Sequence, residues 1–254
     1  MNDEVGLSPA PYRILRKRLL AGAREAEGVA VIIDVFRAFT SAAVMMHLGA
    51  GKIVLLADPD AVLERKAQKG YLAVGEIGGR MVPGFDLGNS PSRILAAGRA
   101  LFEGRTVAQR TSAGVMGALA AARRSDVVIL GSYVTASAVA RYVQKLLAPP
   151  PATVSLVAMG AGGEELTPED EACADYIEHL LTGRPYDHVA ALRRIVEHEC
   201  TRKFLRGDHE HFPPSDPIYC LQRDLFDFVA VAALEGEDLV ARRIDVPEPE
   251  KETT

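Results

Sequence analysis

Short apolar runs alternate with amphipathic stretches along most of the chain, and polar or glycine-rich turns separate them. Each run is nearly continuous in valine, isoleucine, leucine and alanine, which is typical of strands buried on both faces of a sheet. The predicted strands are Val29–Asp34, Lys52–Ala57, Tyr71–Gly75, Thr106–Gln109, Asp126–Gly131, Thr153–Met159 and Phe226–Ala233. The predicted helices are Ala38–Leu48, Asp58–Lys69, Ser90–Ala97, Gly114–Ala122, Thr135–Leu147 and Pro168–Leu181. This alternation predicts an α/β fold whose sheet is covered by helices on both faces.

The pattern is less regular after Arg184. The remaining segments predict one or two helices in Tyr186–Arg206, a loop in Gly207–Pro217 and an edge strand in Asp238–Val246. The stiff connector Pro149–Pro151 does not interrupt the strand–helix rhythm. We therefore expect a single α/β domain over residues 1–246, followed by a disordered tail at 247–254.

Two helix starts carry recognisable capping residues. Ser90-Pro91 and Thr167-Pro168 each place a hydroxyl residue at the N-cap and proline at the first helical position. Glu169 and Asp170 follow in the first turn, where acidic side chains favour the helix dipole.

Composition narrows the possible functions. The chain has 254 residues and a net charge of −5, which argues against an electrostatically driven nucleic-acid or membrane binder. No apolar run approaches the roughly 18–20 residues that a membrane span needs. The three cysteines are too few and too scattered for a disulfide framework, so we expect a cytoplasmic protein with reduced thiols.

The first candidate site combines Asp34, at the end of an apolar run, with Arg37, where the next helix is expected to begin. Ligands of open α/β sheets bind outside the carboxyl ends of the strands, and helix N-termini offer N–H groups to anions. Arg37 adds a fork of donors that suits phosphate, sulfonate or carboxylate. The structural alternative is an ion pair that caps the helix, but the position favours a functional site.

The second candidate site is a glycine-rich segment that starts at Gly75 and contains five glycines within 14 residues. Glu76 ends a predicted strand, as Asp34 does, and Asp86, Asn89 and Ser90 lie before the next helix. These oxygen ligands and small donors suit Mg²⁺ and an oxyanion. A simple turn with an N-cap serine is the equally weighted alternative.

Two further strand-to-helix junctions carry polar side chains. Arg110, Thr111 and Ser112 follow one strand, and Ser132 follows another. Taken singly, each hydroxyl is as easily a helix cap. Taken together with Asp34 and Glu76, they predict one polar edge of the sheet.

The segment Gly160–Glu165 imitates a dinucleotide-binding fingerprint, but Glu165 occupies the third glycine position and acids crowd the helix start. A pyrophosphate would be repelled there, so we exclude an NAD site. Glu169 and Asp170 could hold a metal or could simply favour the helix dipole. The Cys200–Arg206 spacing matches a cysteine phosphatase loop, but its intervening residues are helix-like and lack a glycine-rich cradle.

Taken in order, these segments resemble the 2-phosphosulfolactate phosphatase family. The matching signatures are Asp34-Val-Phe-Arg-Ala38, Gly84-Phe-Asp-Leu-Gly-Asn-Ser-Pro91, Gly131-Ser-Tyr-Val-Thr-Ala-Ser-Ala138, Glu169-Asp170 with Cys173-Ala174, and Asp216-Pro-Ile-Tyr-Cys220 with Asp224. They run from about residue 29 to 231, nearly the whole chain.

The resemblance implies a Mg²⁺-dependent phosphatase that converts 2-phospho-3-sulfolactate to 3-sulfolactate and phosphate, a step of coenzyme M biosynthesis in methanogens. It also implies a three-layer α/β/α sandwich with a mixed, mostly parallel sheet, and a homodimer. Two segments depart from the family pattern. Ile77 replaces an arginine, and a Thr-Thr-Asn-Gly-Thr segment reads Thr111-Ser-Ala-Gly-Val115 here, with Arg110 in front of it.

These features together predict metal-assisted hydrolysis of a small anionic phosphomonoester. Catalytic roles are predicted for Asp34, Arg37 and Glu76. The predicted metal ligands are Asp34, Glu76, Asp86, Glu169 and Asp170, and the predicted substrate-binding residues are Asp86, Asn89, Ser90, Arg110, Thr111, Ser112 and Ser132. Asp34, Glu169 or Asp170 would serve as general base. The alternatives are a non-catalytic phospho-anion-binding or regulatory homologue and, less favoured, a lyase or transferase.

Overall fold

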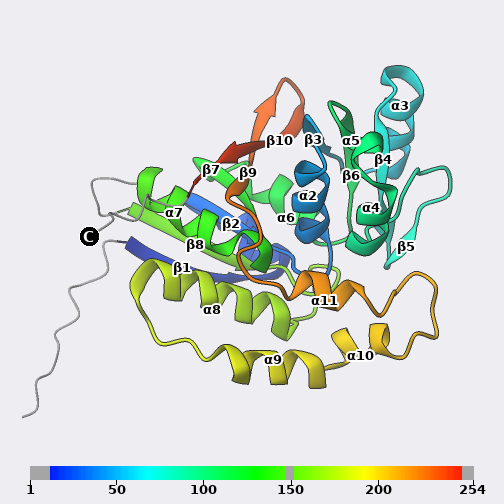
Figure 1. Ribbon diagram of the computed structural model, residues 1–254. Coiled ribbons are helices and arrows are strands. Elements are labelled where there is room, and N and C mark those ends of the chain that lie inside the picture. The colour runs from blue at the N-terminus through cyan, green and yellow to red at the C-terminus, as the bar shows by residue number, and fades with distance from the viewer. Residues whose placement is uncertain (1–11, 147–151, 248–254) are drawn as a thin grey trace, which may run out of the picture.

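One ten-stranded sheet runs through the chain. The structure is a computed structural model, and it describes residues 12–146 and 152–247 (Figure 1). The strand order is β1-β8-β2-β7-β9-β10-β3-β6-β4-β5. The strands are β1 (Tyr12–Arg18), β2 (Val29–Ile33), β3 (Lys52–Leu55), β4 (Leu72–Ile77), β5 (Arg80–Met81), β6 (Thr106–Arg110), β7 (Val127–Gly131), β8 (Ala152–Ala158), β9 (Phe228–Glu235) and β10 (Asp238–Asp245).

The sheet consists of two parallel blocks joined by a hairpin. Strands β1, β8, β2 and β7 pair in parallel, as do β3, β6 and β4. The β9–β10 hairpin lies between the blocks, and the pairs β7–β9, β9–β10 and β10–β3 are all antiparallel. Three antiparallel steps reverse the strand direction, so the two blocks run in opposite senses along the ladder. The predicted mixed, mostly parallel sheet is confirmed.

Helices cover both faces of the sheet. They are α1 (Leu19–Arg24), α2 (Ala38–His47), α3 (Pro59–Lys69), α4 (Pro91–Ala97), α5 (Arg99–Phe102), α6 (Gly114–Ala121), α7 (Ala136–Leu146), α8 (Pro168–Thr182), α9 (His188–Glu197), α10 (Glu199–Leu205) and α11 (Asp216–Cys220), with a 3-10 turn at Tyr133–Thr135. Alternate residues of β2 separate the two layers. Val29, Val31 and Ile33 pack with α7, α8 and α9, whereas Ala30 and Ile32 pack with α1, α2 and α6. The three-layer α/β/α arrangement therefore follows from strands that are apolar on both faces.

Most predicted elements are confirmed within one or two residues at each end, and the differences have physical causes. The apolar-run criterion misses β1 because four of its seven residues are arginine or lysine. The prediction of an edge strand at Asp238–Val246 is wrong, because β10 lies between β9 and β3. Only Leu239, Val240 and Ala241 pair with β3, and these three residues are buried while the charged remainder is largely exposed.

The C-terminal part also differs in detail. The predicted loop Gly207–Pro217 ends in the short helix α11, which begins at Asp216. The proline connector and residues 248–254 of the predicted tail lie outside the described residues, and the single-domain division stays a prediction.

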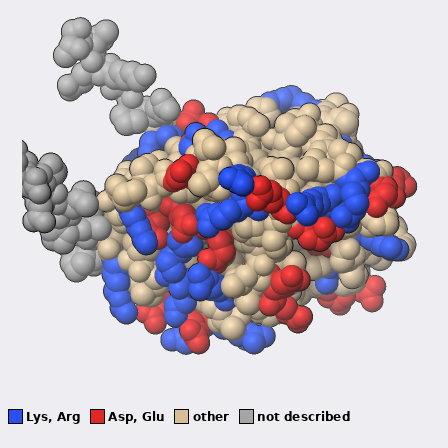
Figure 2. All heavy atoms as spheres, turned by 90° about the horizontal axis from the view of Figure 1, so that it is seen from below, with Lys and Arg blue, Asp and Glu red and all other residues tan. Residues whose placement is uncertain are grey.

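Ion pairs hold the edge strand β1 against α8. Arg16 contacts Asp175 at 2.6 Å and Glu178 at 3.0 Å, and Arg18 contacts Glu171 at 2.8 Å. Figure 2 shows the molecule from below, on the side of α8 and α9, with acidic and basic groups interspersed. Over the described ranges, no helix is long and apolar enough to cross a membrane.

Candidate active site

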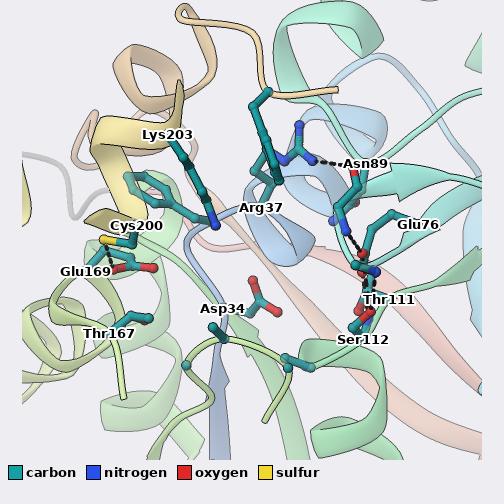
Figure 3. Close-up of a pocket in the computed structure, with 18 of the residues that line it drawn as sticks. Asp34, Arg37, Glu76, Asn89, Thr111, Ser112, Thr167, Glu169, Cys200 and Lys203 are labelled. Atoms are coloured by element: carbon teal, nitrogen blue, oxygen red, sulfur yellow. Dashed lines mark hydrogen bonds between the residues drawn. The ribbon is translucent and has the colours of Figure 1, made fainter. Parts of the chain in front are cut away.

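A pocket of about 270 Å³ is lined by the turns that follow strands of both parallel blocks (Figure 3). The turns after β2, β4, β6 and β8 line one part of it, and the start of α8, helix α10 and Phe212 line the rest. The Gly114 N–H, at the start of α6, donates to Asp34 Oδ2 at 2.8 Å, so the carboxyl ends of β6 and β2 converge here. Three of the four predicted polar strand ends meet here, whereas Ser132 does not line the pocket, and the blocks do not share one direction in the sheet.

Asp34 lies at the centre of the pocket and is 5% exposed. Its Oδ1 accepts a hydrogen bond from Ala38 N at 3.1 Å, so the N-termini of both α2 and α6 donate to this one carboxylate. Burial, assisted by the nearby Glu76 and Glu169, raises the pKa of Asp34 to about 7, although these two hydrogen bonds oppose the rise. Asp34 therefore exchanges its proton near neutral pH.

Glu76 is held on the opposite wall by three donors. Its Oε2 accepts from Gly79 N at 2.5 Å and from Ser112 Oγ at 3.2 Å, and its Oε1 accepts from Ser112 N at 2.7 Å. Arg110 lies behind this wall and donates to the Glu76 carbonyl oxygen at 2.6 Å. Glu76 therefore ties the turn after β4 to the turn after β6.

Glu169 and Asp170 differ in role although they are neighbours. Glu169 lines the pocket, and its Oε2 accepts from Cys200 Sγ at 3.0 Å. Asp170 does not line the pocket, because its oxygens accept from Val35 N at 2.7 Å and Gly160 N at 2.8 Å. Burial raises the pKa of both carboxyls, and their mutual repulsion contributes for Asp170.

Arg37 is buried, and its guanidinium makes internal contacts. It donates to Asp216 Oδ2 at 2.8 Å, to the His211 carbonyl at 2.9 Å and to the Gly79 carbonyl at 3.1 Å. Phe204 and Phe212 lie 5.3 and 5.4 Å from the guanidinium carbon. The alternative of an Arg37 ion pair is thus realised, but with Asp216 in place of Asp34.

The other predicted site residues fall into two groups. Asn89, Thr111 and Ser112 line the pocket. Asp86, Ser90, Arg110 and Ser132 do not. The reasons are visible in their contacts.

Asp86 accepts from Lys66 Nζ at 2.6 Å and from Ala73 N at 2.9 Å, on the outer side of β4. Ser90 donates to Asp216 Oδ1 at 2.8 Å and caps α4, as its Ser-Pro pattern predicts. Ser132 Oγ is buried and has no hydrogen-bond partner within residues 12–146 and 152–247.

Five pocket residues are not among the predicted site residues: Thr167, Cys200, Lys203, Phe204 and Phe212. Four of them belong to α10 and the loop after it, whose sequence carries neither a glycine-rich turn nor a strand end. Thr167 was predicted as an N-cap; it occupies that position in α8, but its side chain makes no capping hydrogen bond. Burial raises the pKa of the Cys200 thiol, which disfavours the thiolate form that a nucleophilic cysteine needs.

The pocket fits Mg²⁺ only in a water-rich arrangement. Among the described residues, no group of three or more His, Cys, Asp or Glu side chains lies close enough to enclose an ion. Mg²⁺, however, commonly keeps several waters and uses one or two carboxylates. Asp34 and Glu169 are buried, face the same pocket and repel each other, which a cation would relieve.

The fold and this pocket define an α/β enzyme with a carboxylate-lined site at the carboxyl ends of its strands. Residues 14–234 match the family described as 2-phosphosulpholactate phosphatase, and the chain belongs to that family. The predicted family, and with it the class of phosphoric monoester hydrolases, is confirmed.

Three relatives are each described as a probable 2-phosphosulfolactate phosphatase. The Bacillus subtilis protein is 32% identical over 216 residues, covering 84% of this chain and 91% of the relative. The Caldicellulosiruptor saccharolyticus protein is 30% identical over 233 residues, covering 86% and 93%. The Thermosynechococcus vestitus protein is 35% identical over 224 residues, covering 79% and 87%.

Proposed function

We propose that this protein is a Mg²⁺-dependent phosphatase that hydrolyses a small phosphorylated hydroxy acid, 2-phosphosulfolactate, to sulfolactate and phosphate. The observation that carries the proposal is Asp34, a buried carboxylate at a strand end whose pKa of about 7 lies near physiological pH. The names of the relatives support the substrate.

Asp34 and Glu169 would hold the metal, with waters completing its coordination. The chemistry that bound Mg²⁺ supplies is neutralisation of phosphoryl charge and a lower pKa for a water ligand. The N-termini of α2 and α6 keep the Asp34 carboxylate oriented, since one N–H from each donates to a different oxygen. Asn89, Thr111 and Ser112 add neutral polar groups to the wall that faces the substrate.

A general base is available within the pocket. Asp34 and Glu169 both line it, burial raises the pKa of both, and whichever of the two leaves an oxygen free of the metal would take the proton from water. Asp170 fits this role less well, because two backbone N–H groups occupy its oxygens outside the pocket. Arg37 acts by positioning, since it joins the Gly79 turn to the segment that contains His211 and Asp216.

The departures from the family pattern bear on the substrate. Ile77 is half-exposed and does not line the pocket, and Arg110 supports the Glu76 wall from behind. These placements favour a phosphoryl site of the family type with altered surroundings. A non-catalytic phospho-anion-binding homologue is the second candidate, favoured by the engagement of both Arg37 and Glu76 in internal hydrogen bonds. The homodimeric state and the cytoplasmic location stay predictions.

The test is phosphate release from 2-phosphosulfolactate, phosphoglycolate and a panel of other phosphomonoesters, with Mg²⁺ and with EDTA. We expect Mg²⁺-dependent release of phosphate together with sulfolactate, identified by mass. A different product mass would indicate a lyase or transferase. A ligand that raises the melting temperature without being consumed would indicate the non-catalytic homologue.

A further inference from the structure

Lys203 is a cation in the pocket that the phosphatase chemistry described above does not use. It lies on α10, is partly buried and lines the pocket, and Figure 3 shows its side chain directed inward above Asp34. Its ammonium lies 5.5 Å from the centre of the Phe204 ring and 4.9 Å from that of Phe212. Within the described part of the chain, it makes no ion pair of 4.0 Å or less. The aromatic rings therefore hold a cation at the pocket without neutralising it.

The other basic side chain of the pocket is already matched. Arg37 lies 2.8 Å from Asp216, which is fully buried, so the pair is electrically balanced within the protein. Asp34 lies in the turn after β2, and Glu169 lies in the first turn of α8. Lys203 acts on the Glu169 carboxylate through the pocket and opposes the rise of its pKa, but among the described residues it makes no ion pair with it, so its ammonium remains free to meet a second negative charge of a ligand.

A second polar group lies in the same pocket. Thr167 lines the pocket at the start of α8, and its buried Oγ1 meets no geometric criterion for a hydrogen bond within the described residues. The hydroxyl does lie close enough to the Glu169 carboxylate to act on its pKa, so a ligand oxygen at Thr167 would share the hydroxyl with Glu169. Thr167 and Lys203 come from α8 and α10, on the side away from the Glu76 wall (Figure 3).

We propose that Lys203, assisted by Thr167, binds the anionic group of the substrate that is not transferred, and so selects phosphorylated hydroxy acids that carry a second strong anion. This inference rests on the proposed function, because it assigns a subsite within the same pocket. The ammonium is a point charge with three rotatable donors, so it can donate hydrogen bonds to either a sulfonate or a carboxylate. Phosphosulfolactate offers both groups, and substrate analogues can separate them.

The experiment compares three substrates on wild type and Lys203→Met, which keeps an unbranched stem near the two phenylalanines. They are 2-phospho-3-sulfolactate, 2-phospholactate without the sulfonate, and 2-phosphooxypropane-1-sulfonate without the carboxylate. We expect Lys203→Met to lower kcat/KM for the complete substrate by about 10- to 100-fold, the range for losing a charged hydrogen bond. The analogue that lacks the partner of Lys203 should change by less than about threefold.

Two variants serve as controls. Arg202→Met removes an exposed cation from the neighbouring position of α10 and should leave all three substrates unchanged. Lys203→Arg keeps the charge and should restore most of the selectivity. The proposal is overturned if Lys203→Met slows all three substrates equally, which would place Lys203 at the phosphoryl group, or if it slows none.

A binding measurement separates this inference from the proposed function. Calorimetric titration with 3-sulfolactate, lactate and 2-hydroxypropane-1-sulfonate requires no turnover. We expect Lys203→Met to bind 3-sulfolactate at least about tenfold more weakly than wild type. If the wild type hydrolyses nothing but shows this difference, the phosphatase proposal fails and the subsite stands. Equal binding by both proteins, or no binding by either, overturns the subsite.

Discussion

Asp216 organises the segments behind Arg37, although it does not itself line the pocket. It is fully buried and accepts hydrogen bonds from Arg37, from Ser90 Oγ at 2.8 Å and from Ser92 Oγ at 2.6 Å. An unpaired charge is costly in such a place, and removing one partner of a buried pair typically costs about 3–5 kcal/mol. Asp216 therefore links α11 to the start of α4 and to the turn that bears Arg37.

We expect Asp216→Asn to lower the free energy of unfolding by about 3 kcal/mol or more, because it leaves the buried Arg37 without a counter-charge. Urea denaturation measures this change. The control is Glu210→Gln, whose side chain is 90% exposed in its pair with Arg93 and should matter by less than about 1 kcal/mol. Equal stability of Asp216→Asn and wild type would mean that the pair does not support the fold.

At this scale the sequence predicts the position of Asp34 but not the partners of Arg37. Asp34 follows an apolar run directly, and the strand pattern alone places it at the sheet edge. Arg37 and Asp216 are 179 positions apart, and no local pattern pairs them. No local sequence pattern marks Lys203 as a pocket residue either, because its role depends on where α10 packs.

The start of helix α6 lies in close contact with Asp34. A Cβ atom added at Gly114 would lie 2.8 Å from Asp34 Oδ2 and 2.9 Å from Ala38 Cβ. Both atoms are fixed by the α2 turn, so the start of α6 would have to move away from Asp34.

We expect Gly114→Ala to reduce kcat/KM at least about tenfold and to destabilise the fold by about 1–3 kcal/mol, the usual cost of overpacking. Steady-state kinetics and denaturation test this. Gly51→Ala is a matched control, because its added Cβ would meet neighbours no closer than 3.4 Å. Normal activity in Gly114→Ala would show that the α6 contact with Asp34 is not needed.

Buried strands are the elements that the sequence predicts best, because burial on both faces leaves continuous apolar runs. Strands with charged residues are predicted poorly. The apolar pattern does not reveal β1. It indicates an edge strand for β10, because the second half of β10 is mostly charged, and that half pairs only with β9. The α10 segment was predicted as helix, but its contribution to the pocket depends on packing between distant segments.

In the metal-free state, the free energy of unfolding of the protein should fall as pH rises, because its buried carboxyl groups lose their protons. Burial raises the pKa of Asp34 from 3.8 to about 7, and it also raises the pKa values of Glu169 and Asp170. The folded state therefore binds more protons than the unfolded state between these values. The contribution of such a group is fully present below its unfolded pKa and is lost as pH rises through the folded pKa.

We expect the stability difference between pH 5 and pH 8, measured by urea denaturation in EDTA, to be larger for wild type than for Asp34→Asn. Subtracting the variant removes the contribution of other titrating groups, including the histidines. Addition of Mg²⁺ should stabilise the wild type more at pH 8 than at pH 6, because metal and proton compete for the carboxylate. Identical pH dependence in the two proteins would contradict the raised pKa of Asp34.

The shape of the sheet was the least predictable feature at this scale. The alternating pattern predicts parallel strands covered by helices, and both blocks conform. The β9–β10 hairpin reverses one block relative to the other, and this order rests on pairings between strands far apart in the chain. The pocket depends on that strand order, because turns from both blocks line it. The sequence predicts only that polar residues at strand ends lie close together.

The most direct test is steady-state phosphate release from 2-phosphosulfolactate in the presence of Mg²⁺, comparing wild type with Asp34→Asn. The surface variant Asp245→Asn serves as the control. We expect Mg²⁺-dependent turnover in wild type and in the control, and at least a roughly 1,000-fold lower kcat in Asp34→Asn. Turnover that persists in Asp34→Asn, or no turnover of any phosphomonoester by the wild type, would contradict catalysis at this pocket.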